Sequence, residues 1–563
     1  MGKVAVVSVC SVFLVAMVVA VAVGVSRRNG GEAPPNTNGI STSTKAVKAI
    51  CQPTDYRETC EKSLANANST DPKELIKVGF QATIDEIKAV VANSTTLNDL
   101  AKDPMARQAL DNCKELMDYA IDDLKRSFNQ LGDFDLSKMG QYVMNLKIWL
   151  GGSLTYQQTC LDGFVNTTGD AGTKMREFLK TSLELTSNGL AMIDQFSDVL
   201  NKLNIPNIPH IDTTPNERRL LQADGSPVWV PPEQQAQIAQ ATANNPEQPN
   251  VVVALDGSAK YKSINEALKE VPKNNPTLFK VYIKAGIYKE QVNITKHMTN
   301  VMFIGDGPTK TTITGSLNYV DGVGTYRTAT VAVAGDGFIA KDIGFENAAG
   351  AIKHQAVALR VQADRAIFYN CQIDGYQDTL YVHSYRQFYR DCTITGTIDF
   401  IFGDAQAVLQ NCKIIIRKPL DNQQCIVTAQ GKAEPREISA IVLHNCTISG
   451  TPEYIAVKDN NRGYLGRPWK EFSTAIFLQN QIDDVIVPEG FLPWNGDFAL
   501  NTLFYTEFGN RGPGSVTTNR VTWSGIKKIN WNQALQFTPD FYLRAQEWIP
   551  QSGAGVPYHP GMM

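Results

Sequence analysis

The chain has 563 residues, of which 43% are hydrophobic and 19% are charged. This composition is typical of a folded globular protein, and it excludes a disordered or fibrous chain. The formal net charge is −3 and no long run of Lys and Arg is present, so the sequence lacks the basic surface that nucleic-acid binding requires.

The first predicted element is an apolar segment at residues 4–25, with basic residues on both sides. It is long enough to span a bilayer, because a transmembrane helix needs about 20 apolar residues. The small residues at 20–22 also suit cleavage by signal peptidase. A cleaved signal peptide and a signal anchor therefore both fit residues 1–40, and either one delivers the rest of the chain to a secretory compartment.

Cysteines and glycosylation sequons agree with that destination. The chain has ten cysteines, and some of them are expected to be bridged in an oxidising compartment. Asn-x-Ser/Thr sequons occur at Asn68, Asn93, Asn166, Asn293 and Asn445. The sequence thus predicts a secreted glycoprotein whose only contact with a membrane is through its N-terminal segment.

Residues 45–200 have the pattern of an all-α four-helix bundle. Asp-Pro pairs at 71–72 and 103–104 each provide an N-cap acceptor before a proline at the first helical position. Apolar residues then recur every three or four positions, as at Ile76, Phe80, Ile84, Ile87 and Val91. Cys113 and Cys160 fall in two different predicted helices, which a disulfide can join.

Residues 201–250 are predicted to be a linker, because prolines, Asn and Gln replace the helical pattern there. The linker contains Arg-Arg-Leu-Leu at 218–221, a dibasic sequence suited to proteolytic cutting.

From residue 251 to 563 the chain consists of short β-branched runs separated by turn residues. Similar phrases recur around Cys371, Cys392, Cys412 and Cys446, and the first three of these cysteines are 21 and 20 positions apart. A repeat of about 20 residues built from β-type segments predicts a solenoid, and a parallel β-helix fits best.

In such a solenoid, equivalent residues of successive coils become neighbours about 4.8 Å apart. Cys371, Cys392 and Cys412 are then expected to stack, and one adjacent pair of them can form a disulfide. Asp378 and Asp399 are also 21 positions apart, so the same register sets two carboxylates side by side.

Adjacent carboxylates in a partly desolvated groove cannot both ionise cheaply, so one keeps a proton while the other stays charged. This division provides a proton donor and a nucleophile or base. Gln377 precedes the first carboxylate, and Gln355 fits the preceding coil. These two amides are candidates to accompany the acidic pair.

Five sequence phrases, spread along the whole chain after residue 251, resemble those of the plant pectin methylesterases. The matching phrases, in order, are Gly286 to Glu290, Gln355 to Leu359, Gly375 to Leu380, Asp399 to Gly403 and Leu465 to Trp469. The resemblance implies an all-β right-handed parallel β-helix that hydrolyses the methyl esters of pectin. The helical segment is similar to the pectin methylesterase inhibitor domain.

The resemblance also implies a role for each site residue. Asp399 is the nucleophile that forms an acyl-enzyme, and Asp378 is the proton donor and later the base. Gln355 and Gln377 hold the oxyanion, and Arg467 keeps Asp399 ionised and oriented.

Further contacts and bridges follow from the same resemblance. The expected substrate contacts are Thr325, Gln355, Tyr381, Phe402, Arg467, Trp469 and Trp494. The expected disulfides are Cys51–Cys60, Cys113–Cys160 and Cys392–Cys412, which leaves Cys371, Cys425 and Cys446 unpaired. The sequence has no phosphate loop and no zinc-ligand spacing, and the reaction requires neither a metal nor a cofactor.

The family's partners are methyl-esterified homogalacturonan, a subtilisin-type protease that cuts at 218–221, and inhibitor proteins or the chain's own pro-domain. The expected location is the cell wall. Two alternative functions have less support in the sequence. A polygalacturonase or lyase is disfavoured because the chain has no Gly-His-Gly phrase and no calcium-binding acidic cluster. An inert or inhibitor-type binding protein is disfavoured because both aspartates, both glutamines and Arg467 are present.

Overall fold

The computed structural model describes residues 42–94, 97, 101–131, 139–202 and 249–563. The chain divides into two compact units, Met1–Ile211 and Asp212–Met563. The apolar segment at 4–25, the dibasic sequence at 218–221 and nearly all of the predicted linker lie outside the described residues. Among the described helices, none is both long enough and apolar enough to cross a membrane.

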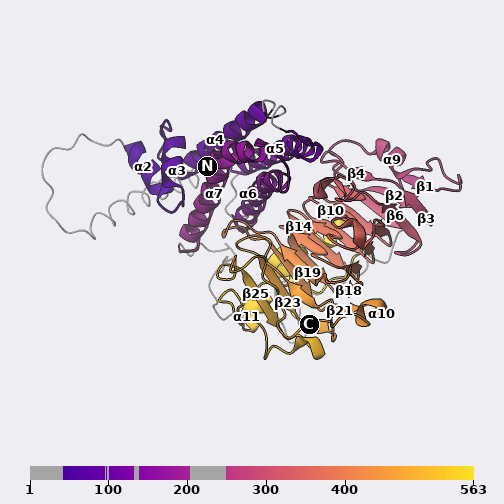
Figure 1. Ribbon diagram of the computed structural model, residues 1–563. Helices are drawn as coiled ribbons and strands as arrows, with labels where there is room; N and C mark the ends of the chain where they lie inside the picture. The colour runs from indigo at the N-terminus through magenta and orange to yellow at the C-terminus, as the bar shows by residue number, and fades with distance from the viewer. Residues whose placement is uncertain (1–41, 95–96, 98–100, 132–138, 203–248) are drawn as a thin grey trace, which may run out of the picture. The chain divides into compact units, whose positions relative to one another are not determined.

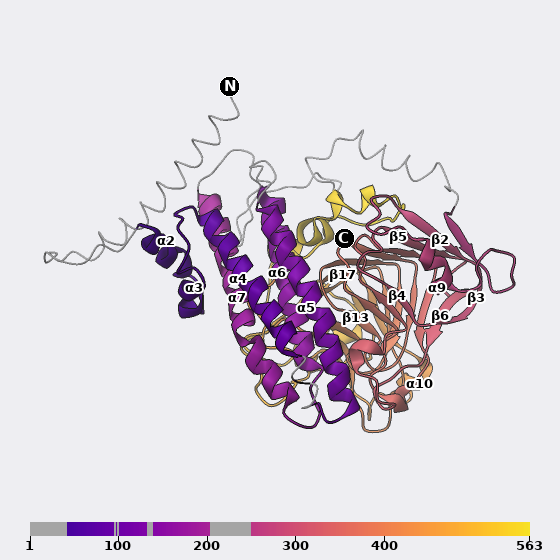
Figure 2. The ribbon, with the colours of Figure 1, turned by 90° about the horizontal axis from the view of Figure 1, so that it is seen from above.

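The first unit is helical, and four long helices form its core (Figures 1 and 2). Its helices are α2 (Thr42–Cys51), α3 (Arg57–Ser63), α4 (Pro72–Ser94), α5 (Pro104–Gln130), α6 (Met139–Asp162) and α7 (Ala171–Lys202). The side chain of Asp103 caps α5 by accepting a hydrogen bond from the amide of Ala106 at 2.7 Å, and Pro104 follows it. Leu110, Leu116 and Leu124 recur on the buried face of α5, as the apolar period requires.

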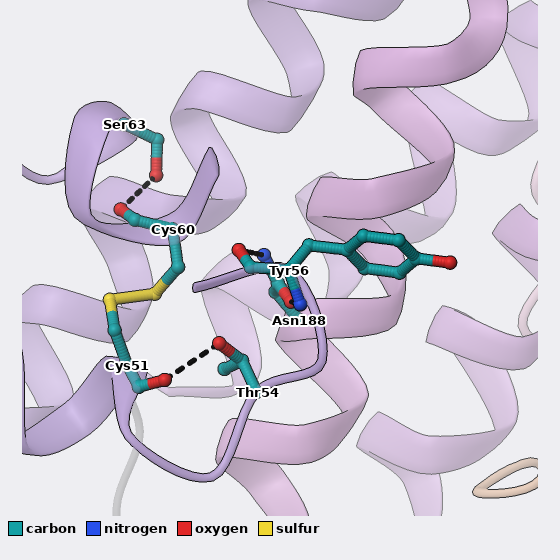
Figure 3. The surroundings of a disulfide bond; sticks show 6 residues. All are labelled: Cys51, Thr54, Tyr56, Cys60, Ser63 and Asn188. Carbon is teal, nitrogen blue, oxygen red and sulfur yellow. Dashed lines mark hydrogen bonds between the residues drawn. A yellow bond between two sulfur atoms is a disulfide. The ribbon is translucent and has the colours of Figure 1, made fainter. Parts of the chain in front are cut away.

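Two disulfides tie this unit together, as expected. Cys51–Cys60 links α2 to α3, and Cys113–Cys160 links α5 to α6. Figure 3 shows how the first of these loops is also fixed to α7: the amide of Tyr56 donates to Oδ1 of Asn188 at 3.2 Å, and Nδ2 of Asn188 donates back to the carbonyl of Tyr56 at 2.9 Å.

The second unit consists of three parallel sheets whose strands step from coil to coil, which is the architecture of a parallel β-helix (Figure 1). In residues 249–563, the ten-stranded sheet contains β1 (Val251–Val253), β2 (Phe279–Ile283), β5 (Val301–Gly305), β8 (Ile339–Lys341), β11 (Ala366–Tyr369), β14 (Arg386–Arg390), β17 (Gln406–Gln410), β20 (Ala440–His444), β23 (Thr474–Leu478) and β25 (Phe504–Phe508). The eight-stranded sheet contains β3 (Gly286–Lys289), β6 (Thr311–Gly315), β9 (Gly344–Asn347), β12 (Gln372–Asp374), β15 (Thr393–Gly396), β18 (Lys413–Ile416), β21 (Thr447–Gly450) and β24 (Gln481–Ile482). The seven-stranded sheet contains β4 (Val292–Ile294), β7 (Val331–Val333), β10 (Leu359–Val361), β13 (Leu380–Val382), β16 (Ile401–Gly403), β19 (Cys425–Gln430) and β22 (Gly463–Gly466).

The coils stack in register, and apolar columns fill the interior. Ile373 pairs with Ile394, Ile394 with Ile414 and Ile414 with Ile448, so isoleucines lie directly above one another. All four side chains are completely buried. The sequence predicted that residues 21 positions apart are neighbours on successive coils. Strands β12 and β15, and strands β13 and β16, pair with this spacing.

The predicted Cys392–Cys412 disulfide is wrong, because both residues are free, buried thiols. The amide of Thr393 donates to the carbonyl of Cys371 and that of Lys413 to the carbonyl of Cys392, so the cysteines do stack as expected. In-register parallel strands keep side-chain directions parallel, however, and Cβ atoms then stay about 4.8 Å apart rather than the 3.8 Å that a disulfide prefers.

The two bridges of the helical unit are expected to differ in their contribution to stability. Cys113–Cys160 closes a loop with a separation of 47 residues and Cys51–Cys60 one of 9, and loop-closure entropy assigns them about 4 and about 2.5 kcal/mol. Urea unfolding of the helical unit, followed by its circular dichroism, measures this contribution. The free energy of unfolding is expected to fall more in the Cys113→Ser, Cys160→Ser variant than in the Cys51→Ser, Cys60→Ser variant. An equal fall in both variants would contradict this account.

Candidate active site

Asp378 and Asp399 lie on adjacent coils, each at the turn that leads into the seven-stranded sheet. Leu380 pairs with Ile401, so the two aspartates occupy equivalent positions on successive coils. The amide of Asp378 donates to the carbonyl of Ile398 at 3.0 Å, which ties the two turns together. The structure thus brings the two predicted carboxylates together through backbone pairing alone.

Arg467 distinguishes the two carboxylates. It follows β22, and its amide donates to the carbonyl of Thr428. Its Nε donates to Oδ1 of Asp399 at 2.8 Å and its Nη2 to Oδ2 at 2.5 Å, which makes a bidentate ion pair. The structure gives Asp378 no such partner among the described residues.

Burial acts on both acids, since Asp378 is 8% exposed and Asp399 is 6% exposed. Burial, and next the neighbouring Asp399, hold the pKa of Asp378 well above its ordinary value. Burial also raises the pKa of Asp399, but the guanidinium of Arg467 opposes that rise. Asp378 is therefore the group that keeps a proton, and Asp399 is the one that ionises first.

The two predicted amides flank this pair on neighbouring turns. The amide of Ala356 donates to the carbonyl of Gln377, so Gln355 and Gln377 approach each other from successive coils. Both side chains are partly exposed. Neither side-chain amide has a hydrogen-bond partner within the described residues, which leaves its N–H groups available to a ligand.

The predicted aromatic residues gather beside the carboxylates. Tyr381 and Phe402 pair across β13 and β16 and stack with ring centroids 4.2 Å apart. Trp469 packs edge-on against Phe402, with centroids 5.9 Å apart. Trp494 lies over the guanidinium of Arg467 at 4.4 Å and is 37% exposed.

These aromatic residues, all expected substrate contacts, differ in how much ring surface they expose. Tyr381 and Phe402 are 3% and 5% exposed, because they bury their faces against each other and against Trp469. Trp494 is therefore the most exposed of these aromatic side chains, and its contact with Arg467 was not predicted.

Thr325 lies in the short helix η4 (Thr325–Arg327), between β6 and β7, and is partly exposed. Its carbonyl accepts a hydrogen bond from the hydroxyl of Thr328 at 2.8 Å. The next residue, Tyr326, packs against His383, which in turn packs against Tyr381. Thr325 thus lies at the edge of the aromatic cluster, whereas the contacts of Tyr326 were not foreseen.

Within the described residues, no group of three or more His, Cys, Asp or Glu is arranged to hold a metal ion.

Comparison with known proteins gives consistent matches to both units. The Pectinesterase family profile matches residues 250–546, and the Plant invertase/pectin methylesterase inhibitor profile matches residues 45–192. The chain is 52% identical over 561 residues to a probable pectinesterase/pectinesterase inhibitor 21 from Arabidopsis thaliana, a match that covers 99% of this chain and 82% of that relative. It is 51% identical over 392 residues to a pectinesterase from Petunia integrifolia, which covers 69% of this chain and 100% of that relative.

Among solved structures, the chain is similar to a pectin methylesterase from carrot, with a TM-score of 0.56 and 46% identity. That match covers 57% of this chain and all of the carrot chain. The helical unit, which ends at Ile211, is too short to supply such a share, so the match must include the β-helix.

The raised pKa of Asp378 predicts a pH-dependent stability. The ordinary pKa is 3.8, and a folded-state pKa above it means that stability is fully present below about pH 4 and is lost as the pH rises toward the folded pKa. Asp378→Asn removes this loss. The variant is expected to gain stability over the wild type with rising pH, by up to about 1.4 kcal/mol per pH unit.

The measurement is thermal or urea unfolding of the chain from Gln222 onward, at intervals between pH 4 and pH 7. The wild type and the Asp378→Asn variant measured at pH 4 are the internal control, because their stabilities are expected to differ least at that pH. A difference that stays constant across the pH range would show that Asp378 does not titrate in this way.

Proposed function

The chain belongs to the pectinesterase family, and we propose that Asp378 and Asp399 hydrolyse the methyl esters of pectin, releasing methanol, through an aspartyl acyl-enzyme. The observation that supports this most directly is the asymmetric acid pair. One buried carboxylate is held by a bidentate arginine, and an equivalent carboxyl on the adjacent coil has no such partner.

Asp399 is the proposed nucleophile. Its carboxylate attacks the carbonyl carbon of the methyl ester, and a tetrahedral oxyanion forms. Arg467 favours the ionised form of Asp399, and the bidentate contact fixes the direction of the attacking oxygen. Arg467 also takes part in substrate binding in this proposal, because its guanidinium lies between Asp399 and Trp494.

Asp378 is the proposed proton donor. When the tetrahedral intermediate collapses, the bond to the methoxy oxygen breaks, and the proton of Asp378 passes to that oxygen so that methanol leaves. A mixed anhydride with Asp399 remains. Asp378, now a carboxylate, takes a proton from a water molecule that attacks the anhydride. This step restores protonated Asp378 and ionised Asp399, and it releases galacturonic acid, which loses its remaining proton to solvent.

Gln355 and Gln377 are the proposed oxyanion donors. Their side-chain amides are available, and they belong to turns joined by the hydrogen bond between Ala356 and Gln377. An amide donor stabilises the developing charge and does not compete for the proton that Asp378 must deliver.

The remaining site residues are proposed to bind the polymer. Trp494 and Trp469 offer ring surface to sugar units, while Tyr381 and Phe402 support the groove wall. Thr325 contacts the bound polysaccharide from the edge of the aromatic cluster. The substrate is methyl-esterified homogalacturonan, and the reaction uses no cofactor.

The helical unit is proposed to be an inhibitor-like pro-domain, and residues 201–250 to be the linker that joins it to the β-helix. A subtilisin-type protease cuts at 218–221, and the enzyme then acts in the cell wall. Residues 1–40 direct the precursor into the secretory pathway, either as a cleaved signal peptide or as an anchor. The match of residues 45–192 to the inhibitor family supports this division.

Loss of either carboxylate is expected to abolish turnover. Asp378→Asn removes the proton donor and Asp399→Asn removes the nucleophile, and each is expected to lower kcat for methanol release from pectin by at least about a thousandfold. The assay is methanol release by the chain from Gln222 onward, with circular dichroism to confirm the fold. Asp374→Asn, on the neighbouring strand β12, is the matched control and should retain activity. An active Asp399→Asn variant would reject the acyl-enzyme.

The pro-domain assignment predicts that cleavage raises activity. The full chain is expected to release methanol more slowly than the chain from Gln222 onward, because the inhibitor-like unit is still attached. Replacing both arginines, Arg218→Ala with Arg219→Ala, is expected to keep the secreted protein at full length. Intact mass and methanol release of the secreted proteins check both points, and cleavage that continues in the variant would reject this processing site.

A further inference from the structure

Arg360 is a buried arginine that forms an ion pair with no carboxylate of the described residues. It lies on β10 and is 4% exposed. Its Nη1 donates to Oε1 of Gln362, and its Nε has no acceptor in the described part of the chain. Arg386, which is also buried, instead forms a bidentate ion pair with Asp364. Because an unpaired buried charge is costly, the environment of Arg360 requires another explanation.

An aromatic ring takes the place of the missing carboxylate. The guanidinium of Arg360 lies 3.6 Å from the ring centroid of Tyr326, which is a close cation–π contact. The hydroxyl of Tyr326 donates to Oε1 of Gln362 at 3.2 Å, and Nδ1 of His383 lies 3.0 Å from the same oxygen. Arg360 and Tyr326 are thus joined both by their direct contact and by a shared acceptor.

Tyr326 belongs to the loop at residues 317–328, and this loop runs beside Gln355. The amide of Tyr319 donates to the carbonyl of Gln355 at 2.9 Å. Farther along the loop, the hydroxyl of Thr328 accepts from the amide of Val357 at 3.0 Å. The backbone on either side of Gln355 is therefore held by loop 317–328.

A second contact secures the base of the same loop. Nδ2 of Asn347, which is 2% exposed, donates to the carbonyls of Leu317 at 2.9 Å and Val357 at 3.1 Å. Asn347 fixes the base, whereas Arg360 fixes the part that contains Tyr326. The cation–π contact with Arg360 holds Tyr326 of η4 beside the seven-stranded sheet. The hydrogen bond to Gln362 and the packing on His383 support it.

We propose that Arg360 is a positioning residue for the oxyanion site: through Tyr326 it anchors loop 317–328, and this loop fixes the backbone from which the Gln355 amide reaches the substrate. This inference rests on the proposed function, in which Gln355 stabilises the oxyanion. Displacing such a donor by about 1 Å reduces turnover far more than it reduces substrate binding.

The choice of a tyrosine as partner follows from the same role. A carboxylate beside Arg360 would anchor the loop equally well, but it would add a negative charge on the coil next to the acid pair. That charge would oppose the oxyanion and would raise the pKa of Asp378 further. The ring of Tyr326 and the amide of Gln362 hold the guanidinium without adding any negative charge.

The test is a double-mutant cycle in the chain from Gln222 onward, with methanol release from pectin as the assay. Arg360→Met is expected to lower kcat about tenfold and to change KM by less than about twofold. Added to Gln355→Ala, the same substitution is expected to cause no further loss. Added to Gln377→Ala, it is expected to lower kcat about tenfold again. Equal losses in both backgrounds would overturn the proposal.

Variants of Tyr326 test the anchor independently of Arg360. Tyr326→Leu is expected to behave like Arg360→Met, because the ring is lost, whereas Tyr326→Phe keeps the ring and is expected to stay within about twofold of the wild type. Arg511→Met removes a charge from an exposed residue that forms a β-bridge with Gln481 of the eight-stranded sheet, and it is the charge-matched control. A Tyr326→Leu variant with wild-type kcat would overturn the proposal, while a wild type that releases no methanol would overturn the proposed function instead.

Discussion

The site depends on one constraint, the parallel stacking of successive coils in register at about 4.8 Å. Backbone hydrogen bonds between strands set this spacing, and every outward side chain inherits it. The same pairing that stacks Ile373 on Ile394 in the core aligns Asp378 with Asp399 at the turns that lead into the seven-stranded sheet. A single slip of register would separate the two acids and expose the isoleucine column, so the stability of the core also maintains the geometry of the site.

Equivalent positions on successive coils would by themselves give Asp378 and Asp399 similar pKa values. The proposed chemistry instead needs one protonated and one ionised carboxyl group. The asymmetry comes from outside the repeat. Arg467 follows β22, two strands beyond β16 in the same sheet, and it reaches back to Asp399 only. Burial raises the pKa of both acids, and the charge of the guanidinium opposes that rise at both, but only Asp399 also accepts its hydrogen bonds. The repeat thus supplies proximity, and a single non-repeating side chain divides the roles.

The predictable part of the structure was the part governed by the repeat. Recurring cysteine phrases gave the 21-residue register and hence the pairing of Asp378 with Asp399, and the helical period gave α4 to α7. The Cys392–Cys412 bridge, which the family resemblance implied, was wrong, because the in-register stacking that makes these cysteines neighbours also keeps their side chains parallel. Arg360 was not singled out, because its partner Tyr326 lies in an insertion between β6 and β7 that follows no period. Its signal was local: a charged residue between Leu359 and Val361, in a strand that is otherwise buried.

The two acids also share an unusual backbone. Asp378 has φ 61° and Asp399 has φ 49°, in the left-handed region that side chains other than glycine rarely adopt. Asp and Asn tolerate this conformation better than other residues with a Cβ, because their short polar side chains can hydrogen-bond locally. The turn geometry therefore favours Asp or Asn at positions 378 and 399. Of these two residues, only Asp provides a nucleophile or a proton donor. It follows that asparagine isolates the loss of the acid, whereas alanine at either position adds backbone strain to the chemical change.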